Sequence, residues 1–291
     1  MHPRSLLASL FVCLAITGCA TKPDQSASLK SAYAPMTAPE HGPLTANEPI
    51  KMEPTAWIKP ESPNRDGGLF GSRSLGGRTI SVGSLTDIHL NDKEVVLTFD
   101  DGPMPGKTRR ILDILDRFHV KASFMMIGQM AQSHPELARE VLARGHAIGS
   151  HTYSHRNLAS MSFDMAMNEF ARGEKAVSDA VDTPVGFFRF PYLSDSRRLR
   201  GALTNRGVVV MDVDIDSKDY FKTSPNAVLN KTLNAIHRRG KGIILMHDIH
   251  NRTIAMLPML LTRLDAEGYH VVSLRYKRSR LPQGSLVASI F

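Results

Sequence analysis

The feature that most constrains the fold of this chain is a regular alternation of strand-like and helix-like segments from residue 86 onward. Short apolar, β-branched runs alternate with longer segments in which apolar residues recur at helical spacing. The expected strands are residues 95–100, 122–127, 146–149, 186–190, 208–213, 243–247 and 270–274. The expected helices are residues 108–119, 135–144, 163–181, 197–205, 226–239 and 254–267. This order predicts an α/β fold.

Strands that alternate with helices favour a mainly parallel sheet, because a helix supplies the crossover that parallel strands require. Glycine lies just past four of the expected helices, where it commonly ends a helix, at Gly145, Gly207, Gly240 and Gly268. Seven strands in the body of the chain indicate a barrel-like arrangement with fewer than eight units. In such folds the chemistry gathers at the carboxyl ends of the strands.

The start of the chain has the pattern of an export signal, with Arg4 followed by a short apolar run and small residues. Ile16-Thr17-Gly18-Cys19 resembles a bacterial lipoprotein box, in which the cysteine carries lipid and becomes the mature N-terminus. We therefore expect residues 1–18 to be a signal peptide and lipid on Cys19 to anchor an exported protein to a membrane. Ala20 in the next position favours an outer membrane, with the protein facing the periplasm. The alternatives are an ordinary signal peptide with incidental cysteines and a buried helix.

Residues 19–85 are expected to form a linker. They contain eight of the 17 prolines, a Gly/Ser-rich run and no sustained strand or helix period, so they bury too little surface to order themselves. Trp57, the only tryptophan, either docks on the body or is an isolated aromatic residue. The folded domain is expected to span residues 86–275, and a fragment that begins near residue 86 is expected to fold.

Composition and charge exclude several classes of protein. The two cysteines, Cys13 and Cys19, are too few for a disulfide-rich scaffold. The net charge of +8 would suit a nucleic-acid-binding protein, but Arg275, Lys277, Arg278 and Arg280 supply +4 of it with no nearby acid. The body is close to neutral, so no nucleic-acid partner is expected. The basic tail, residues 276–291, can attract an anionic lipid or polymer, and the protein is expected to be a monomer.

Two polar clusters at the ends of expected strands combine into a metal-binding pattern. Asp100 and Asp101 close the first of these strands, and two adjacent carboxylates repel unless they share a cation or a proton. His151 and His155 follow the third strand, and they project from one face if Ser150 caps a helical turn. Asp101 with the two histidines then offers a catalytic zinc-type ligand set with open positions for water. Taken separately, the aspartate pair can be a solvated turn, and the spacing of the two histidines can arise by chance.

Three further residues lie at positions suited to chemistry. Arg189 ends the strand 186–190 and either pairs with the aspartates or is a solvated charge. Asp219 belongs to an aspartate-rich run and can orient a catalytic histidine. His247 ends an otherwise apolar strand, which indicates a histidine that faces a cleft and is available as an acid.

In this order, the segments resemble the polysaccharide deacetylases of the NodB-homology type, carbohydrate esterase family 4. The matching motifs are Thr-Phe-Asp-Asp-Gly-Pro at 98–103, Ser-His-Thr-x-x-His at 150–155, Arg-x-Pro-Tyr at 189–192, Asp-Tyr at 219–220 and Leu-x-His at 245–247. The resemblance covers roughly residues 90–275. One departure is Tyr220, where the family more often has tryptophan, and it leaves the shape of the acetyl-pocket wall in question.

The resemblance implies a distorted (β/α) barrel and a divalent metal, usually zinc, with cobalt or nickel as alternatives. The implied metal ligands are Asp101, His151 and His155. The implied general base is Asp100 and the implied general acid is His247.

The resemblance also implies three supporting roles. Arg189 would tune Asp100, Asp219 would tune His247, and the backbone N–H of Tyr192 would help to hold the oxyanion.

The expected function is hydrolysis of acetyl groups, foremost the N-acetyl groups of hexosamine units, in a cell-envelope polysaccharide such as peptidoglycan or an exopolysaccharide. One alternative is a deacetylase of small chitin oligosaccharides, against which the exported, tethered N-terminus argues. The other is a non-catalytic glycan-binding lipoprotein on the same fold. Loss of a metal ligand, the base or the acid would indicate the latter, and the sequence retains them all.

Overall fold

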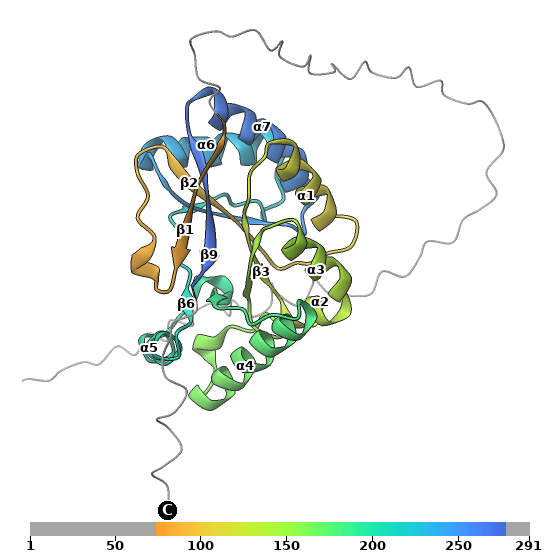
Figure 1. Ribbon diagram of the computed structural model, residues 1–291, viewed down its shortest axis with the longest axis vertical. Helices are drawn as coiled ribbons and strands as arrows, with labels where there is room; N and C mark the ends of the chain where they lie inside the picture. The colour runs from red at the N-terminus through yellow and green to blue at the C-terminus, as the bar shows by residue number, and fades with distance from the viewer. Residues whose placement is uncertain (1–73, 278–291) are drawn as a thin grey trace, which may run out of the picture. The chain divides into compact units, whose positions relative to one another are not determined.

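The computed structural model describes residues 74–277 (Figure 1). The predicted signal peptide, Cys19, Trp57 and residues 278–291 lie outside this range, so the predictions on them are not addressed by the structure. None of the helices in the described range combines the length and apolarity needed to cross a lipid bilayer.

Within residues 74–277, strands and helices alternate along the chain. The strands are β1 (Gly76–Val82), β2 (Glu94–Asp100), β3 (Ser123–Met126), β4 (Ala147–Ser150), β5 (Phe187–Phe188), β6 (Val209–Val210), β7 (Ile215–Asp216), β8 (Gly242–His247) and β9 (His270–Tyr276). The helices are α1 (Thr108–Arg117), α2 (Gly128–Ser133), α3 (Pro135–Ala143), α4 (Phe163–Ala180), α5 (Arg197–Asn205), α6 (Pro225–Arg239) and α7 (Asn251–Ala266). All seven expected strands and six expected helices are present, whereas β1, β7 and α2 were not expected.

Every strand pair in the sheet is parallel, as predicted. The main path runs β1-β9-β2-β3-β4-β5-β6, and β8 joins β2 to β7. No hydrogen-bonded pair joins β6 to β7 among the described residues, so the sheet is not closed. This is the expected distorted (β/α) barrel, and all four glycines expected to end helices have left-handed φ values of 75–81°.

β2 is buried along its whole length and its alternate residues serve two different sides of the sheet. Leu97 and Phe99 belong to a cluster shared with the helices. Val96 belongs to a second cluster, whose buried members come from the strands and their immediate ends. Because side chains alternate along a strand, Thr98 and Asp100 point to the same side as Val96, into the barrel. The alternation therefore places a carboxylate inside the barrel at its carboxyl-terminal rim.

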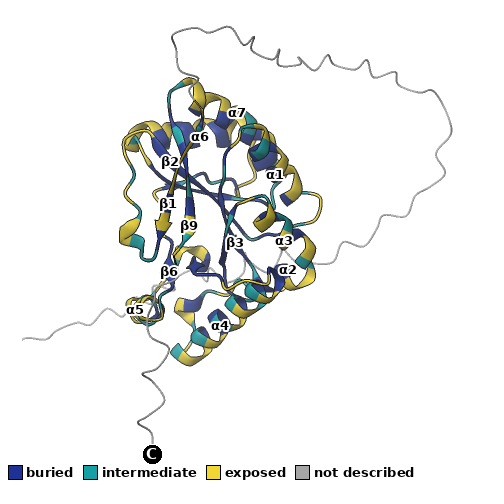
Figure 2. Ribbon diagram, in the orientation of Figure 1, coloured by how far each residue is buried: buried dark blue, intermediate teal, exposed yellow. Residues whose placement is uncertain are grey.

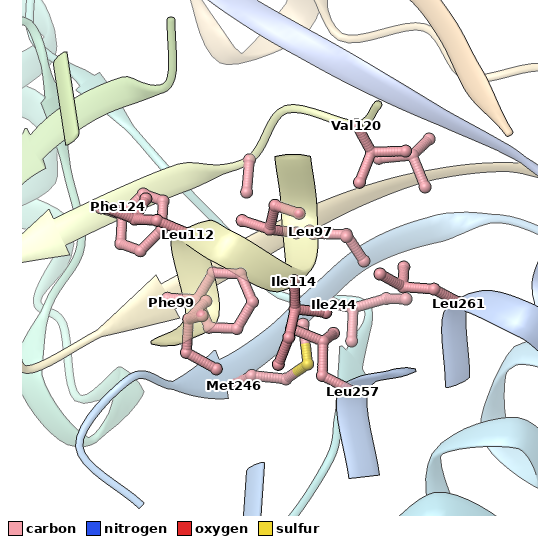
Figure 3. Close-up of a cluster of buried hydrophobic side chains, with 14 of the residues drawn as sticks. Leu97, Phe99, Leu112, Ile114, Val120, Phe124, Ile244, Met246, Leu257 and Leu261 are labelled. Atoms are coloured by element: carbon pink, nitrogen blue, oxygen red, sulfur yellow. The ribbon is translucent and has the colours of Figure 1, made fainter. Parts of the chain in front are cut away.

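The helix-facing side of the sheet forms an apolar layer (Figure 3). Leu97 and Phe99 of β2 lie with Ile244 of β8 against Leu112 of α1 and Leu257 of α7. The helices turn their buried faces toward the sheet and their exposed faces outward (Figure 2). This burial fixes the strands, and with them the position of every loop at the rim.

The position of β1 corrects the predicted domain boundary. β1 lies inside residues 19–85, which the sequence predicts to be a linker, yet it pairs with β9 along the edge of the sheet. Ile80 and Val82 are its two buried residues, and Leu75 just before it is also buried. Five of its seven residues are not buried and it follows a Gly/Ser-rich run, so its apolar pattern is too weak to recognise. A domain boundary at residue 86 is therefore wrong.

We predict that a fragment beginning at residue 86 will be much less stable than one beginning at residue 67. The shorter fragment loses the burial of Leu75, Ile80 and Val82, each of which contributes about 1.5–3 kcal/mol, and it exposes the edge of β9. Urea unfolding of the two fragments measures the difference. Equal midpoints and slopes would show that β1 contributes nothing to the fold.

Candidate active site

The parallel strands bring the predicted functional residues to one rim of the barrel. Asp100 at the end of β2 lies in register with His247 at the end of β8. Ser150 ends β4 beside the end of β5, so His151 and Arg189, the next residues, leave two neighbouring strands at the same level. Residues from four strands therefore meet, although they are far apart in the sequence.

Asp101, His151 and His155 form a cluster that can hold a metal ion. Their ligand atoms all lie within 4.8 Å of one another. Asp101 Oδ1 is 3.6 Å from His151 Nε2 and 3.3 Å from His155 Nε2. This oxygen is buried and has no hydrogen-bond partner among the described residues, which is costly for a carboxylate unless a cation supplies the missing interaction. Two imidazole nitrogens and a carboxylate oxygen suit a catalytic zinc-type site.

His151 is prepared for coordination by its surroundings. Its Nδ1–H donates to the carbonyl oxygen of Arg189 at 2.9 Å, which leaves Nε2 unprotonated and directed at Asp101. Burial is the largest influence on this side chain, and it lowers the pKa of His151 to about 3 even though Asp101 acts in the opposite direction. His151 is therefore a neutral imidazole at neutral pH, the form that binds metals.

The two histidines do not come from a helical turn, so that part of the sequence analysis is wrong. Residues 151–155 form a loop in which Thr152 and His155 have left-handed φ values of 66° and 57°. The backbone N–H of His155 donates to the Thr152 hydroxyl at 3.0 Å, which closes the loop. The histidines meet because this loop folds back on itself.

Arg189 lies at the centre of the site with none of its surface exposed. Its Nη1 donates to Asp100 Oδ1 at 2.7 Å and to the Thr98 hydroxyl at 2.8 Å. Its remaining nitrogens point to the carbonyls of Met211 and Asp212, at 3.5 and 3.3 Å. Arg189 does pair with Asp100, but burial acts more strongly than this charge and raises the pKa of Asp100. The result is a carboxylate that is held in place and is more basic than usual.

His247 is oriented by Asp219, as the sequence analysis anticipated for an aspartate of this run. Its Nδ1–H donates to Asp219 Oδ1 at 2.7 Å, and its backbone N–H donates to Asp219 Oδ2 at 2.8 Å. The Thr253 hydroxyl donates to the same Oδ2 at 2.6 Å. Burial would lower the pKa of His247, but the hydrogen bond and charge of Asp219 outweigh it and raise this pKa to about 9. His247 is therefore protonated at neutral pH, with Nε2–H directed toward Asp101 Oδ2 at 4.0 Å.

The carboxylate of Asp248, the residue after His247, lies against the turn that carries the aspartates. Asp248 is fully buried, and burial raises its pKa to about 7. The Thr108 hydroxyl donates to Asp248 Oδ2 at 2.5 Å. A Cβ at Gly102 would lie 2.1 Å from this oxygen, so a larger residue directly after Asp101 would displace the Asp248 carboxylate.

These residues open into one pocket of about 400 Å³. Its lining residues are Asp100, Asp101, His151, His155, Phe190, Tyr192, Leu193, Asp216, Lys218, Tyr220, Leu245 and His247. Tyr192 has a left-handed φ of 60° and is 62% exposed, with its ring edge-on to His155. Tyr220 is edge-on to His247, and its hydroxyl donates to Asp216 and accepts from Lys218. The pocket therefore contains the pair His151 and His155 together with His247, and exposed tyrosine rings form part of its wall.

Comparisons with known proteins identify the family of this chain. A model described as "Polysaccharide deacetylase" matches residues 87–211. The chain is 32% identical over 196 residues to a peptidoglycan-N-acetylglucosamine deacetylase of Bacillus cereus, covering 64% of the chain and 91% of that protein. The chain belongs to the polysaccharide deacetylase family. It is also 32% identical over 183 residues to the peptidoglycan-N-acetylglucosamine deacetylase PgdA of Listeria monocytogenes, but spans only 38% of that protein's length.

A solved structure supports the same polysaccharide deacetylase fold. A peptidoglycan deacetylase of Bdellovibrio bacteriovorus superposes with a TM-score of 0.61 at 34% sequence identity, over 71% of this chain and 57% of that one. The departure at Tyr220 lies in the pocket wall and does not involve a residue of the metal-ligand cluster.

The structure adds residues that the sequence analysis missed. Thr98 donates to the Ile244 carbonyl at 2.8 Å and accepts from Arg189, so it supports the buried arginine. Thr253 holds Asp219 from the first turn of α7. Thr98 belongs to the first motif and lies two residues before Asp100, so both side chains are on the same face of the strand. A hydroxyl at this position could have been recognised as a neighbour of the predicted base. Nothing in the sequence marks Thr253, because its partner is 34 residues away.

We predict that Asp219→Asn will lower the pKa of His247 from about 9 to below the ordinary histidine value of about 6.5. The buried environment remains in this variant, while the carboxylate that stabilises the imidazolium is gone. NMR titration of the His247 imidazole in metal-free protein measures the change. Asp195→Asn, which removes an aspartate paired with Arg200 instead, is the control. A pKa near 9 in both variants would show that Asp219 does not set the charge of His247.

Proposed function

We propose that this protein is a metal-dependent hydrolase that removes acetyl groups, foremost N-acetyl groups of hexosamine units, from a cell-envelope polysaccharide, with release of acetate. The observation that carries the proposal is the convergence, in one pocket, of a metal-ligand cluster with a buried carboxylate and a protonated histidine. The peptidoglycan deacetylases to which the chain is similar support peptidoglycan as the first substrate to test.

Asp101, His151 and His155 would hold a divalent ion, for which zinc is proposed and cobalt or nickel are alternatives. Such an ion, when bound, would polarise the acetyl carbonyl and lower the pKa of water to about 7. The unpartnered Asp101 oxygen and the neutral His151 imidazole both suit a cation at this position.

Asp100 is the proposed general base. Its carboxylate is buried at the rim, held by Arg189, and its Oδ2 lies 3.8 Å from His151 Nε2, beside the metal-ligand cluster. Burial raises its pKa, which increases its capacity to accept a proton from the attacking water. The fixed geometry also prevents the base from turning away from the pocket.

His247 is the proposed general acid. The amine of an amino sugar leaves as an anion unless it receives a proton, so the tetrahedral intermediate collapses only with an acid nearby. Nε2–H of His247 faces the pocket and Asp219 keeps the imidazole protonated. The backbone N–H of Tyr192 is proposed to stabilise the oxyanion, as the motif resemblance implies, because Tyr192 lines the same pocket as His247 and the metal-ligand cluster.

We predict that two single substitutions will separate metal binding from proton transfer. Asp100→Asn keeps the ligand cluster and is expected to retain the metal while deacetylation falls about 10²–10⁴-fold. His151→Ala removes a ligand and is expected to lower metal content and activity together. Metal content by elemental analysis and acetate release from acetylated glycans are the two measurements, and Asp195→Asn is the control.

The outcomes distinguish the alternatives. Normal acetate release by Asp100→Asn would remove this aspartate from the chemistry, and full metal loading of His151→Ala would contradict the proposed ligands. Release from chitin oligosaccharides but not from peptidoglycan or exopolysaccharides would favour the small-substrate alternative. Binding to glycans without acetate release by wild-type protein would indicate a non-catalytic glycan-binding protein.

We also propose that the protein is exported and held on a membrane by lipid on Cys19, with an outer membrane facing the periplasm favoured. The supporting observation is the Ile16-Thr17-Gly18-Cys19 sequence after a short apolar run. Several acyl chains on one residue hold a protein firmly, whereas a single chain gives only marginal binding. Such an anchor would present the pocket to a fixed polymer.

We predict that Cys19→Ser will change how the protein is held at the membrane without changing the activity of the domain. The variant is expected either to leave the membrane fraction or to stay bound only through an uncleaved signal peptide. Mass spectrometry of the wild-type N-terminus is the decisive measurement. A free, unmodified Cys19 or a cleavage at another residue would contradict the lipid anchor.

A further inference from the structure

The loop that carries His151 and His155 has a conformation that needs outside support. Thr152 and His155 both adopt left-handed φ values, which are unfavourable for residues with a Cβ. His155 depends on this loop more than His151 does, because His151 directly follows β4 and donates to the Arg189 carbonyl. His155 therefore needs contacts from other elements to stay directed at Asp101.

Helix α2 supports the loop through the first two N–H groups of the helix. The backbone N–H of Gly128 donates to the Thr152 carbonyl at 2.9 Å, and that of Gln129 donates to the Tyr153 carbonyl at 3.0 Å. These are N–H groups of the first turn of α2, which lack partners within the helix. The carbonyl groups of Thr152 and Tyr153 are thereby satisfied.

Helix α4 supports the same loop through a buried carboxylate. Glu169 is only 5% exposed, and its Oε1 accepts both the backbone N–H and the hydroxyl of Ser154, each at 2.6 Å. Arg172 lies 4.0 Å from Glu169 Oε2 and stacks over the Tyr153 ring at 3.9 Å. Two charge-assisted bonds on one oxygen fix the residue directly before His155.

The close approach of α4 to the loop depends on a glycine. A Cβ at Gly173 would lie 2.3 Å from the Thr152 carbonyl carbon and 2.6 Å from the Tyr153 nitrogen. Glu169 and Gly173 are four residues apart, so they lie on one face of α4. That face is shaped to receive the loop.

We propose that Glu169 is a positioning residue for the metal centre. Its carboxylate fixes Ser154, which holds His155 in its left-handed conformation beside Asp101 before any ion binds. A preformed ligand set binds a metal more tightly, because binding then pays no cost for ordering the loop. The inference rests on the proposed function insofar as Asp101, His151 and His155 bind a metal.

The test measures the zinc affinity of full-length, metal-free protein by competition with a chromogenic chelator. Glu169→Ala removes both bonds to Ser154 and is expected to weaken zinc binding about 10–100-fold, the usual effect of losing a group that orients a ligand. Glu169→Gln keeps a carbonyl oxygen but not the charge, so its affinity is expected to lie between those of Glu169→Ala and wild type. Activity of Glu169→Ala at saturating zinc is expected to return toward wild type, because Asp100 and His247 are unchanged.

Glu174→Ala is the matched control. Glu174 is also on α4, but the charge that acts on it is that of Arg206, and no bond joins it to the 151–155 loop among the described residues. Its zinc affinity is expected to equal that of wild type. Thermal unfolding of the metal-free variants distinguishes a general loss of stability from a loss of zinc affinity. A general loss of stability would lower the unfolding midpoint without weakening zinc binding by the folded protein.

Wild-type zinc affinity in Glu169→Ala would overturn the inference. If that variant does not fold, Glu169→Gln and Ser154→Ala decide, since Ser154→Ala removes only the hydroxyl donor. Weaker zinc binding in both supports the inference, and unchanged binding in either overturns it. Absence of zinc binding by the wild-type protein would instead contradict the proposed function, so the two failures are distinguishable.

Discussion

Arg189 is a fully buried cation inside the barrel, and both halves of the site depend on it. Its guanidinium holds Asp100, while its carbonyl oxygen accepts from His151 and so fixes the ring that faces Asp101. Taking such a charge out of water is expensive, and leaving one partner of a buried pair alone costs about 3–5 kcal/mol. Thr98 and two carbonyl groups complete the coordination of the guanidinium. Base and metal ligand are therefore placed by one residue.

The strand register brings the remaining residues of the site to the base that Arg189 holds. Parallel strands end at the same rim, and the pairing of Asp100 with His247 on β8 sets the base beside the acid. The two-residue alternation of β2 decides that Asp100 faces inward while Phe99 packs against the helices. A one-residue slip of this strand would exchange those faces. The apolar core on the helix side thus determines where the carboxylate lies.

Much of this arrangement could be predicted from the sequence, because strand ends in a parallel sheet converge whatever the connecting loops do. Asp100, Asp101 and His247 follow directly from that rule. The 151–155 loop could not be predicted, since its left-handed residues depend on contacts with α2 and α4 that are distant in sequence. β1 was missed for a different reason: an edge strand with two buried residues has almost no apolar period. Local pattern fails where tertiary contacts decide the backbone.

His151 and His247, which both line the pocket, show how one residue type acquires opposite functions. Each donates its Nδ1–H, but His151 donates to a neutral carbonyl and His247 donates to the Asp219 carboxylate. Removal from water disfavours the imidazolium in both, and only the Asp219 carboxylate outweighs that penalty. The pKa of His151 consequently falls to about 3 and that of His247 rises to about 9. At neutral pH one Nε2 offers a lone pair to a cation and the other offers a proton to a leaving group. The atom that accepts from Nδ1 therefore assigns the role of each ring.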